Sequence, residues 1–257
     1  MPNLLNLTKT ESDNLLDLRK EKLEMLCLEK RDLSGLTARV AIVLDYSGSM
    51  STLYRNGTIQ ATIERLYPIA ESWDDNGEME LWIFSDGFYR LPNISRSNYY
   101  GYVEREIMNK GYRMAGTQYS PVIADVAKKY TEEEPAPLPD YIIFITDGDC
   151  FDRDRAANEI SKVSKYPIFW QFVGIGNASF RFLESLDDMS GRYIDNANFF
   201  KMMDVLEGDD EVVYNKLLAE FPEWLKDPKV KQMLIDGYTA PHSSVGKKGG
   251  FFSKLFG

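Results

Sequence analysis

The stretch Val40-Ala41-Ile42-Val43-Leu44-Asp45-Tyr46-Ser47-Gly48-Ser49 decides the fold. Its first five residues are an apolar run too short for a helix, and such a run is typical of a strand buried on both faces of a parallel sheet. The run ends at a carboxylate that is followed by two hydroxyls, in the spacing Asp-x-Ser-x-Ser. The stretch therefore predicts a central strand that leads into a polar loop.

Similar runs recur along the chain and alternate with helical patterns. Strands are predicted at 79–84, 141–145 and 168–173, with a last strand at Tyr193-Ile194, and helices at 59–69, 100–108, 121–130, 153–165 and 180–187. Asp86-Gly87 is a hairpin signal that leads to a short edge strand near 89–91. This alternation predicts an α/β fold with a doubly wound, mostly parallel sheet, one short antiparallel edge strand and flanking helices.

The two ends of the chain differ in composition from this central part. Ser12 to about Asp32 has the pattern of an amphipathic helix, and residues 211–236 predict acidic helices broken by Pro222 and Pro228. We therefore divide the chain into a helical extension (1–36), an α/β domain (37–205), helices that pack on it (206–237) and a tail (238–257).

Charge and cysteine content exclude several classes of protein. The 257 residues carry 30 basic and 40 acidic side chains, a net charge of -10 that repels phosphate backbones, so nucleic-acid binding is not expected. Two cysteines are too few for a disulfide scaffold. The sequence shows no signal peptide and no apolar stretch long enough for a bilayer, so a cytoplasmic location is expected.

Oxygen-bearing side chains follow two of the predicted strands. Asp45 and Asp147 each end an apolar run, and ligands in open parallel sheets bind at the carboxyl ends of strands. Carboxylate and hydroxyl oxygens suit Mg2+, with Mn2+ or Ca2+ as alternatives, and the lack of imidazole and thiolate argues against zinc or copper. The competing interpretation is that the Asp and Ser residues after the strand simply cap the following helix, as Ser49 or Ser51 could.

The segment Asp45-Tyr46-Ser47-Gly48-Ser49-Met50 resembles the metal-ion-dependent adhesion site of von Willebrand factor A (vWA) domains. That family adds a threonine from a loop in mid-chain and an aspartate after a later strand, which Gly116-Thr117 and Thr146-Asp147-Gly148 match in order. The resemblance covers about residues 37–205 and implies a metal site made of Asp45, Ser47, Ser49, Thr117 and Asp147.

The resemblance also implies a role for each residue. Ser47, Ser49 and Thr117 would touch the metal, and Asp45 and Asp147 would act through water and hydrogen bonds. A vacant position on the ion would be filled by a Glu or Asp of a partner protein. The resemblance therefore implies a binding module that is not an enzyme.

A narrower resemblance is to bacterial vWA proteins of the tellurium-resistance and stress-response group. Asn6-Leu7-Thr8-Lys9 and Phe221-Pro222-Glu223-Trp224-Leu225 carry this likeness, together with the Leu/Lys/Glu-rich segment before the first strand. It implies a cytoplasmic protein that works with other products of a stress-response gene cluster.

An enzymatic alternative is a Mg2+-dependent phosphoester hydrolase in which Asp45 or Asp147 acts as base or nucleophile. Against it, Ser47 stands where aspartyl-phosphate enzymes have a second acid. The only histidine, His242, lies in the tail, and the chain has no Gly-x-x-x-x-Gly-Lys-Ser/Thr loop.

Two further features need an interpretation. Asp149, Asp152 and Asp154 follow the strand-end aspartate and are read as a solvated, helix-capping loop, and the acids around Cys150 predict a raised thiol pKa. The tail combines Lys247, Lys248 and Lys254 with Phe251, Phe252, Leu255 and Phe256. It suits docking on a protein groove, with an anionic membrane as the weaker alternative.

Overall fold

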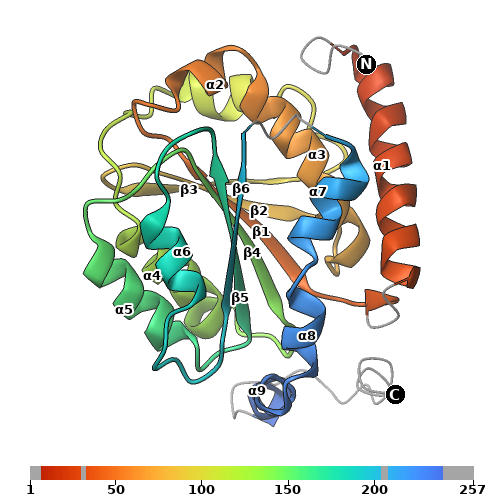
Figure 1. Cartoon of the computed structure of the whole chain (residues 1–257). Coiled ribbons are helices and arrows are strands. Elements are labelled where there is room, and N and C mark those ends of the chain that lie inside the picture. Colours follow the sequence, from red (N-terminus) through yellow and green to blue (C-terminus); the bar gives the residue numbers. More distant parts are fainter. Residues whose placement is uncertain (1–6, 30–32, 204–207, 240–257) are drawn as a thin grey trace.

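The computed structural model describes residues 7–29, 33–203 and 208–239 (Figure 1). Six strands form one sheet in the order β3-β2-β1-β4-β5-β6. Their bounds are β1 Arg39–Asp45, β2 Met79–Phe84, β3 Phe88–Ile94, β4 Asp140–Thr146, β5 Ile168–Ile175 and β6 Ala197–Met202. Every neighbouring pair is parallel except β2 and β3. The predicted doubly wound sheet with one antiparallel edge strand is confirmed.

Helices cover both faces of this sheet (Figure 1). Val40, Ile42 and Leu44 of β1 pack in the core with α3 (Thr58–Trp73), α7 (Asp210–Leu217) and α8 (Phe221–Lys226). Ala41 and Val43 point to the other face and pack with α4 (Ser120–Lys128), α5 (Arg153–Val163) and α6 (Arg181–Asp187). Successive side chains of a strand alternate between faces, so a strand covered on both sides must be apolar throughout.

The N-terminal helix α1 (Lys9–Glu29) lies outside α3 and α7 as a further layer, as Figure 1 shows. It begins earlier than predicted because Thr8 and Glu11 form a capping box: the Thr8 hydroxyl accepts the Glu11 N–H, and the Glu11 carboxylate accepts the Thr8 N–H. Ser12, where the helical pattern was expected to begin, lies inside the helix and donates its hydroxyl to buried Glu64 of α3.

The last strand was predicted at the wrong place. Tyr193 and Ile194 are not in a strand, and β6 begins three residues later at Ala197. Ile194 is buried by core packing alone, while Tyr193 stays half-exposed. An edge strand such as β6, with Asn198 and Lys201 in it, lacks the continuous apolar run of the central strands.

The remaining elements are short. Gly57, at φ 86°, separates α2 (Ser51–Arg55), which was not predicted, from α3, which contains the helix predicted at 59–69. The helix predicted at 100–108 is a π-helical turn (Val103–Ile107) followed by a 3-10 turn (Met108–Lys110), and a second π-helical turn (Lys129–Glu133) follows α4.

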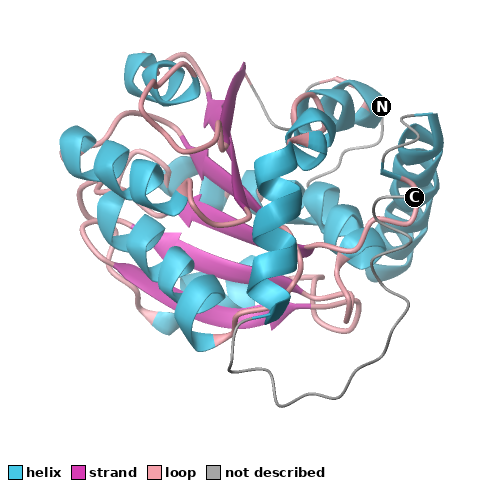
Figure 2. Ribbon diagram, turned by 90° about the horizontal axis from the view of Figure 1, so that it is seen from below, coloured by secondary structure: helices cyan, strands magenta, loops and turns pink. Residues whose placement is uncertain are grey.

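The acidic C-terminal region forms α7, α8 and α9 (Pro228–Thr239), as the two prolines indicated. Pro222 lies in the first turn of α8, and Pro228 opens α9. Figure 2, turned by 90° from the view of Figure 1, shows the sheet with helices packed around it. Among the described residues, no helix has the length and apolar character that a membrane span requires.

Candidate metal centre

The predicted site residues lie where the winding of the sheet reverses. From β1 the chain builds β2 and β3 on one side, and β4, β5 and β6 lie on the other side. β1 and β4 are adjacent and parallel, paired from Arg39↔Asp140 to Leu44↔Ile145, so their carboxyl ends meet. Asp45 is the last residue of β1, and Asp147 follows β4 directly. This crevice is where open α/β sheets bind ligands.

Hydrogen bonds join four of the five predicted residues. Oδ1 of Asp45 accepts the Ser47 N–H at 2.7 Å, which curls the loop back over the strand end. The Ser47 and Ser49 hydroxyl oxygens are 3.0 Å apart. The Ser49 hydroxyl donates to Oδ1 of Asp147 at 2.8 Å. The alternation of side chains in Asp-x-Ser-x-Ser therefore brings two hydroxyls between two carboxylates.

The fifth residue, Thr117, comes from a third loop that lies against the first. Ala115 forms a parallel bridge with Ser47, and its carbonyl accepts the Gly48 N–H at 3.3 Å. The Thr117 carbonyl accepts the Phe151 N–H at 3.0 Å, which ties this loop to the segment after β4. These backbone contacts hold Thr117 between the other two loops. The side chain of Thr117 takes no part in the hydrogen bonds that join the four other residues.

Three comparisons relate the chain to known proteins. The family model described as "vWA found in TerF C terminus" matches residues 37–234. The chain belongs to this vWA family. The vWA domain is 43% identical over 243 residues to the uncharacterized protein YcbR of Bacillus subtilis (strain 168), covering 94% of this chain and 98% of YcbR. The matched range runs through α7 and α8 and into α9, beyond the predicted domain boundary at residue 205.

Solved structures share the fold at low identity. Proximal thread matrix protein 1 from the mussel byssus aligns with a TM-score of 0.54 and 14% identity over 71% of this chain. The chain spans about half of that protein, 47% of its length. Manganese-loaded TRAP protein of Plasmodium vivax aligns with a TM-score of 0.51 and 16% identity, covering 64% of this chain and 68% of that one. These likenesses show the vWA fold.

The carboxylate of Asp45 is supported by two residues of the vWA domain whose role the sequence did not predict. The Thr146 hydroxyl donates to Oδ2 of Asp45 at 2.6 Å. The Tyr119 hydroxyl, at the start of α4, in turn lies 3.1 Å from the Thr146 hydroxyl and 2.7 Å from the Gly148 carbonyl. Thr146 is the residue before Asp147, so its position at the end of an apolar run was the available signal. Nothing in the sequence pointed to Tyr119.

Burial makes the site electrostatically unfavourable for its own carboxylates. It raises the pKa of Asp45 to about 6, against the hydrogen bonds from Thr146 and Ser47, and the nearby Asp147 adds to the increase. Burial also raises the pKa of Asp147, with the Ser49 hydroxyl opposing it. The groups that stabilise the two ionised carboxylates are hydroxyls and backbone amides, and no lysine or arginine is among them. A cation bound here would favour their ionised forms.

The helix-capping interpretation does not fit the loop. The residue that caps α2 is Met50, and no side chain accepts a hydrogen bond at that cap. The Ser49 hydroxyl is turned toward Asp147 instead. Capping does occur nearby, because buried Asp152 accepts the Tyr119 and Ser120 N–H groups at the start of α4, both at 2.9 Å.

Of the three acids that follow Asp147, which were expected in a solvated, helix-capping loop, Asp152 is buried and Asp154 is exposed. Asp149 forms an ion pair with Arg153, and Asp152 caps α4. Burial, followed by the nearby carboxylates, raises the pKa of the Cys150 thiol to about 12, so the predicted raised value is confirmed. Among the described residues, His, Cys, Asp and Glu side chains alone form no cluster of three or more suited to a metal. Any metal held here would therefore depend on the hydroxyls.

Proposed function

We propose that the chain is a non-enzymatic binding module that holds one divalent cation at Asp45, Ser47, Ser49, Thr117 and Asp147. Mg2+ is the proposed ion, with Mn2+ or Ca2+ as alternatives. The observation that carries the proposal is the 3.0 Å separation of the Ser47 and Ser49 oxygens. Two octahedral ligands at about 2.1 Å from Mg2+ lie roughly 3 Å apart when they are adjacent, so these hydroxyls are already spaced for a shared ion.

The donor set explains why such an ion would attract a partner. Ser47, Ser49 and Thr117 would offer neutral oxygens, and Asp45 and Asp147 would orient them or bind through water. A cation with few negative direct ligands stays electrophilic, so a Glu or Asp side chain of another protein gains much by completing its coordination. TRAP protein of Plasmodium vivax, which shares the fold, is manganese-loaded, and this supports the proposal that a protein of this fold binds a divalent ion.

The surface beside the site suits a protein partner. Phe151 is 84% exposed, which is unusual for a large apolar side chain. Its backbone N–H donates a hydrogen bond to the Thr117 carbonyl. Its ring lies over Gly116, so close that a Cβ added at Gly116 would be only 3.3 Å from the ring. Exposed aromatic residues next to a specific polar contact are frequent anchors of binding interfaces. Phe151 would supply the apolar contact beside the metal-bound acid.

The hydrolase alternative gains no support from the geometry. Both oxygens of Asp45 accept hydrogen bonds, one from the Ser47 amide and one from the Thr146 hydroxyl. A carboxylate fixed in this way is suited to orienting ligands rather than to attacking a substrate. The match to a family named after TerF supports a setting in bacterial tellurium resistance or stress response, and a cytoplasmic location is part of the same proposal.

The test is capture of partners from a lysate of the source organism in Mg2+ and in EDTA, with the wild type and Asp45→Ala. We expect specific proteins to bind the wild type in Mg2+, to elute with EDTA and to be absent with Asp45→Ala. Asp154→Ala is the matched control, because it removes a nearby exposed carboxylate outside the site. Capture that ignores both the chelator and Asp45→Ala would refute the proposal.

A further inference from the structure

A cavity of about 660 Å³ lies at the opposite end of the sheet from the candidate metal centre. Arg39 and Asp140, the first residues of β1 and β4, are in its wall, and α9 closes one side. Most of its surface is apolar. The residues that give it this character are Tyr130, Pro135, Tyr166, Pro167, Tyr193 and Met233. Tyr166 and Tyr193 are 46% and 48% exposed, so aromatic surface on the rim is open to a ligand.

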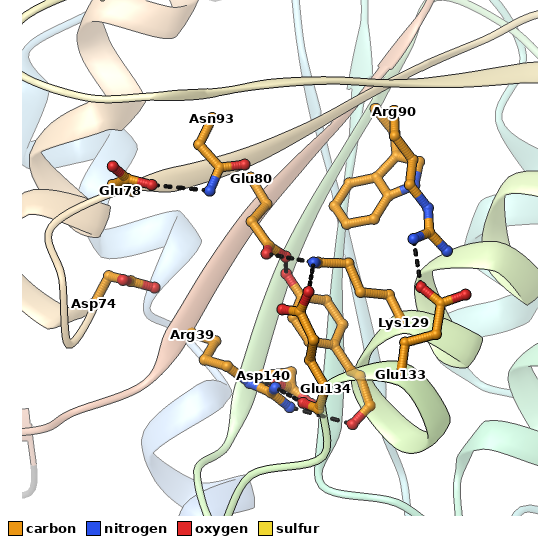
Figure 3. Close-up of polar contacts among 12 residues, drawn as sticks. Arg39, Asp74, Glu78, Glu80, Arg90, Asn93, Lys129, Glu133, Glu134 and Asp140 are labelled. Carbon is orange, nitrogen blue, oxygen red and sulfur yellow. Dashed lines mark hydrogen bonds and ion pairs between the residues drawn. The ribbon is translucent and has the colours of Figure 1, made fainter.

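A second hollow of about 310 Å³ adjoins this cavity and shares Arg39, Pro135 and Ala136 with it. It is strongly acidic, since Arg39 is the only basic residue in a wall that holds five carboxylates: Asp74, Asp75, Glu78, Glu80 and Glu134. Figure 3 shows the ion pairs of the two nearby basic residues. Arg39 pairs with Asp140, and Lys129 pairs with both Glu80 and Glu134. Asp74 accepts only backbone N–H groups, from Val40 and Asn76.

The chain itself contains a segment with the complementary chemistry. Asp236 of α9 lies in the wall of the cavity, and α9 ends at Thr239. No acid follows Asp236 in the sequence. The later residues include three lysines and four large apolar side chains, namely Lys247, Lys248, Phe251, Phe252, Lys254, Leu255 and Phe256.

We propose that residues 247–256 dock on this surface of their own chain, with the aromatic side chains in the apolar cavity and the lysines beside the acidic hollow. The cavity itself is not acidic, because Lys165 and Lys229 are part of its lining. The basic residues of the segment are therefore matched to the adjoining hollow, and the apolar ones to the exposed rings of Tyr166 and Tyr193.

Chain length and entropy permit this contact. The residues 240–250 that connect Thr239 to Phe251 can span roughly 35 Å when extended, which is ample for a cavity that α9 itself borders. Closing such a loop costs little more than closing a shorter one, because the entropy depends only logarithmically on length. A tethered ligand of this kind acts at an effective concentration of about 1 mM, so even a weak site would be largely filled.

The test uses the full chain and a labelled synthetic peptide of residues 245–257. In a four-serine variant, Phe251, Phe252, Leu255 and Phe256 are each replaced by Ser, so the tail stays in place without its apolar anchors. Fluorescence anisotropy should show saturable peptide binding to this variant, and binding to the wild type that is weaker by about tenfold or more, because the tethered segment competes.

Added to the four-serine variant, Tyr166→Glu should abolish peptide binding, whereas Tyr100→Glu, at another exposed tyrosine, should leave it unchanged. Three results would each overturn the proposal: no binding to the four-serine variant, equal binding to the wild type and the variant, or binding that ignores Tyr166→Glu. A wild-type dimer that becomes monomeric in the four-serine variant would also overturn it, since a second copy would then supply the segment.

Discussion

The two ends of β1 and β4 make an informative comparison. At the amino ends, buried Asp140 lies 2.6 Å from the guanidinium of Arg39. At the carboxyl ends, buried Asp45 lies near Asp147 and is bonded only to hydroxyls and amides. Burial raises the pKa of both Asp140 and Asp45, but only Asp140 has a protein cation that opposes the rise.

The difference separates a structural carboxylate from one that awaits a ligand. Burying an anion without a partner is costly, and proteins rarely keep one unless something compensates it. Arg39 offsets only part of the cost of burying Asp140, because burial still raises the pKa of Asp140 to about 7. At Asp45 and Asp147 the compensation has to come from outside, which is what the proposed divalent cation would supply. Variants that remove each carboxylate in turn test whether the two ends of the strands differ in this way.

The largest expected effect is on stability, at the amino ends. Asp140→Ala leaves the Arg39 guanidinium without its carboxylate in a wall where its side chain is only 14% exposed. We expect a loss of about 3–5 kcal/mol in the free energy of unfolding, measured in urea. The matched control is Asp17→Ala, which breaks an exposed ion pair with Arg96 and should cost about 1 kcal/mol or less. Equal losses for the two variants would contradict the distinction.

The next effect is on metal affinity, at the carboxyl ends. Asp45→Ala removes the carboxylate that orients Ser47 through its amide, and we expect Mg2+ or Mn2+ affinity to fall by about 100-fold in calorimetric titration. Ser49→Ala removes one of the proposed direct ligands and should have a comparable effect. Asp154→Ala should bind like the wild type. A wild-type chain that takes up neither ion would end the metal hypothesis.

Metal should also stabilise the fold, by a smaller amount. At a free Mg2+ concentration ten times the dissociation constant, we expect the free energy of unfolding to rise by about 1.4 kcal/mol, which corresponds to a few degrees in Tm. Scanning fluorimetry with and without EDTA measures this shift. Asp45→Ala should show no shift, while Asp17→Ala should keep it. A shift that survives in Asp45→Ala would place the stabilising ion elsewhere.

The smallest effect concerns a third carboxylate that lacks a cation. Burial raises the pKa of Asp74 from 3.8 to about 6, despite N–H donors from Asn76 and Val40. Because the folded pKa is above the unfolded one, Asp74 should lower stability as pH rises from about 4 to about 6, with no further loss above that. Asp74→Asn should reduce this fall by on the order of 1 kcal/mol, since partial exposure screens the charge. Unfolding curves at pH 4, 5, 6 and 7, all in EDTA, test the slope.

The central strands and the strand-end residues could be predicted from sequence because burial on both faces leaves a continuous apolar run. β2 was predicted at its observed bounds, and β1 and β4 to within one residue at each end. The strand ends then place Asp45 and Asp147 at one edge of the sheet without further information. The proximity of Ser47, Ser49 and Asp147 follows from that topology, and the structure shows it directly.

What could not be predicted depends on contacts between distant parts of the chain. β6 carries polar residues at the edge of the sheet, so its pattern is weaker than that of Tyr193-Ile194, which is apolar without being a strand. The support of Asp45 by Thr146 and Tyr119 requires three elements to be placed first.

The parallel pairing of β1 and β4 has a further consequence. Both strands contain seven residues, so their ends are about 20 Å apart. A protein bound at the candidate metal centre and a peptide bound in the cavity at the other end of the sheet would therefore not collide. Each could bind and dissociate independently of the other. The molecule therefore has two separate candidate binding sites on one sheet. Any coupling measured between them would have to pass through the strands that join them.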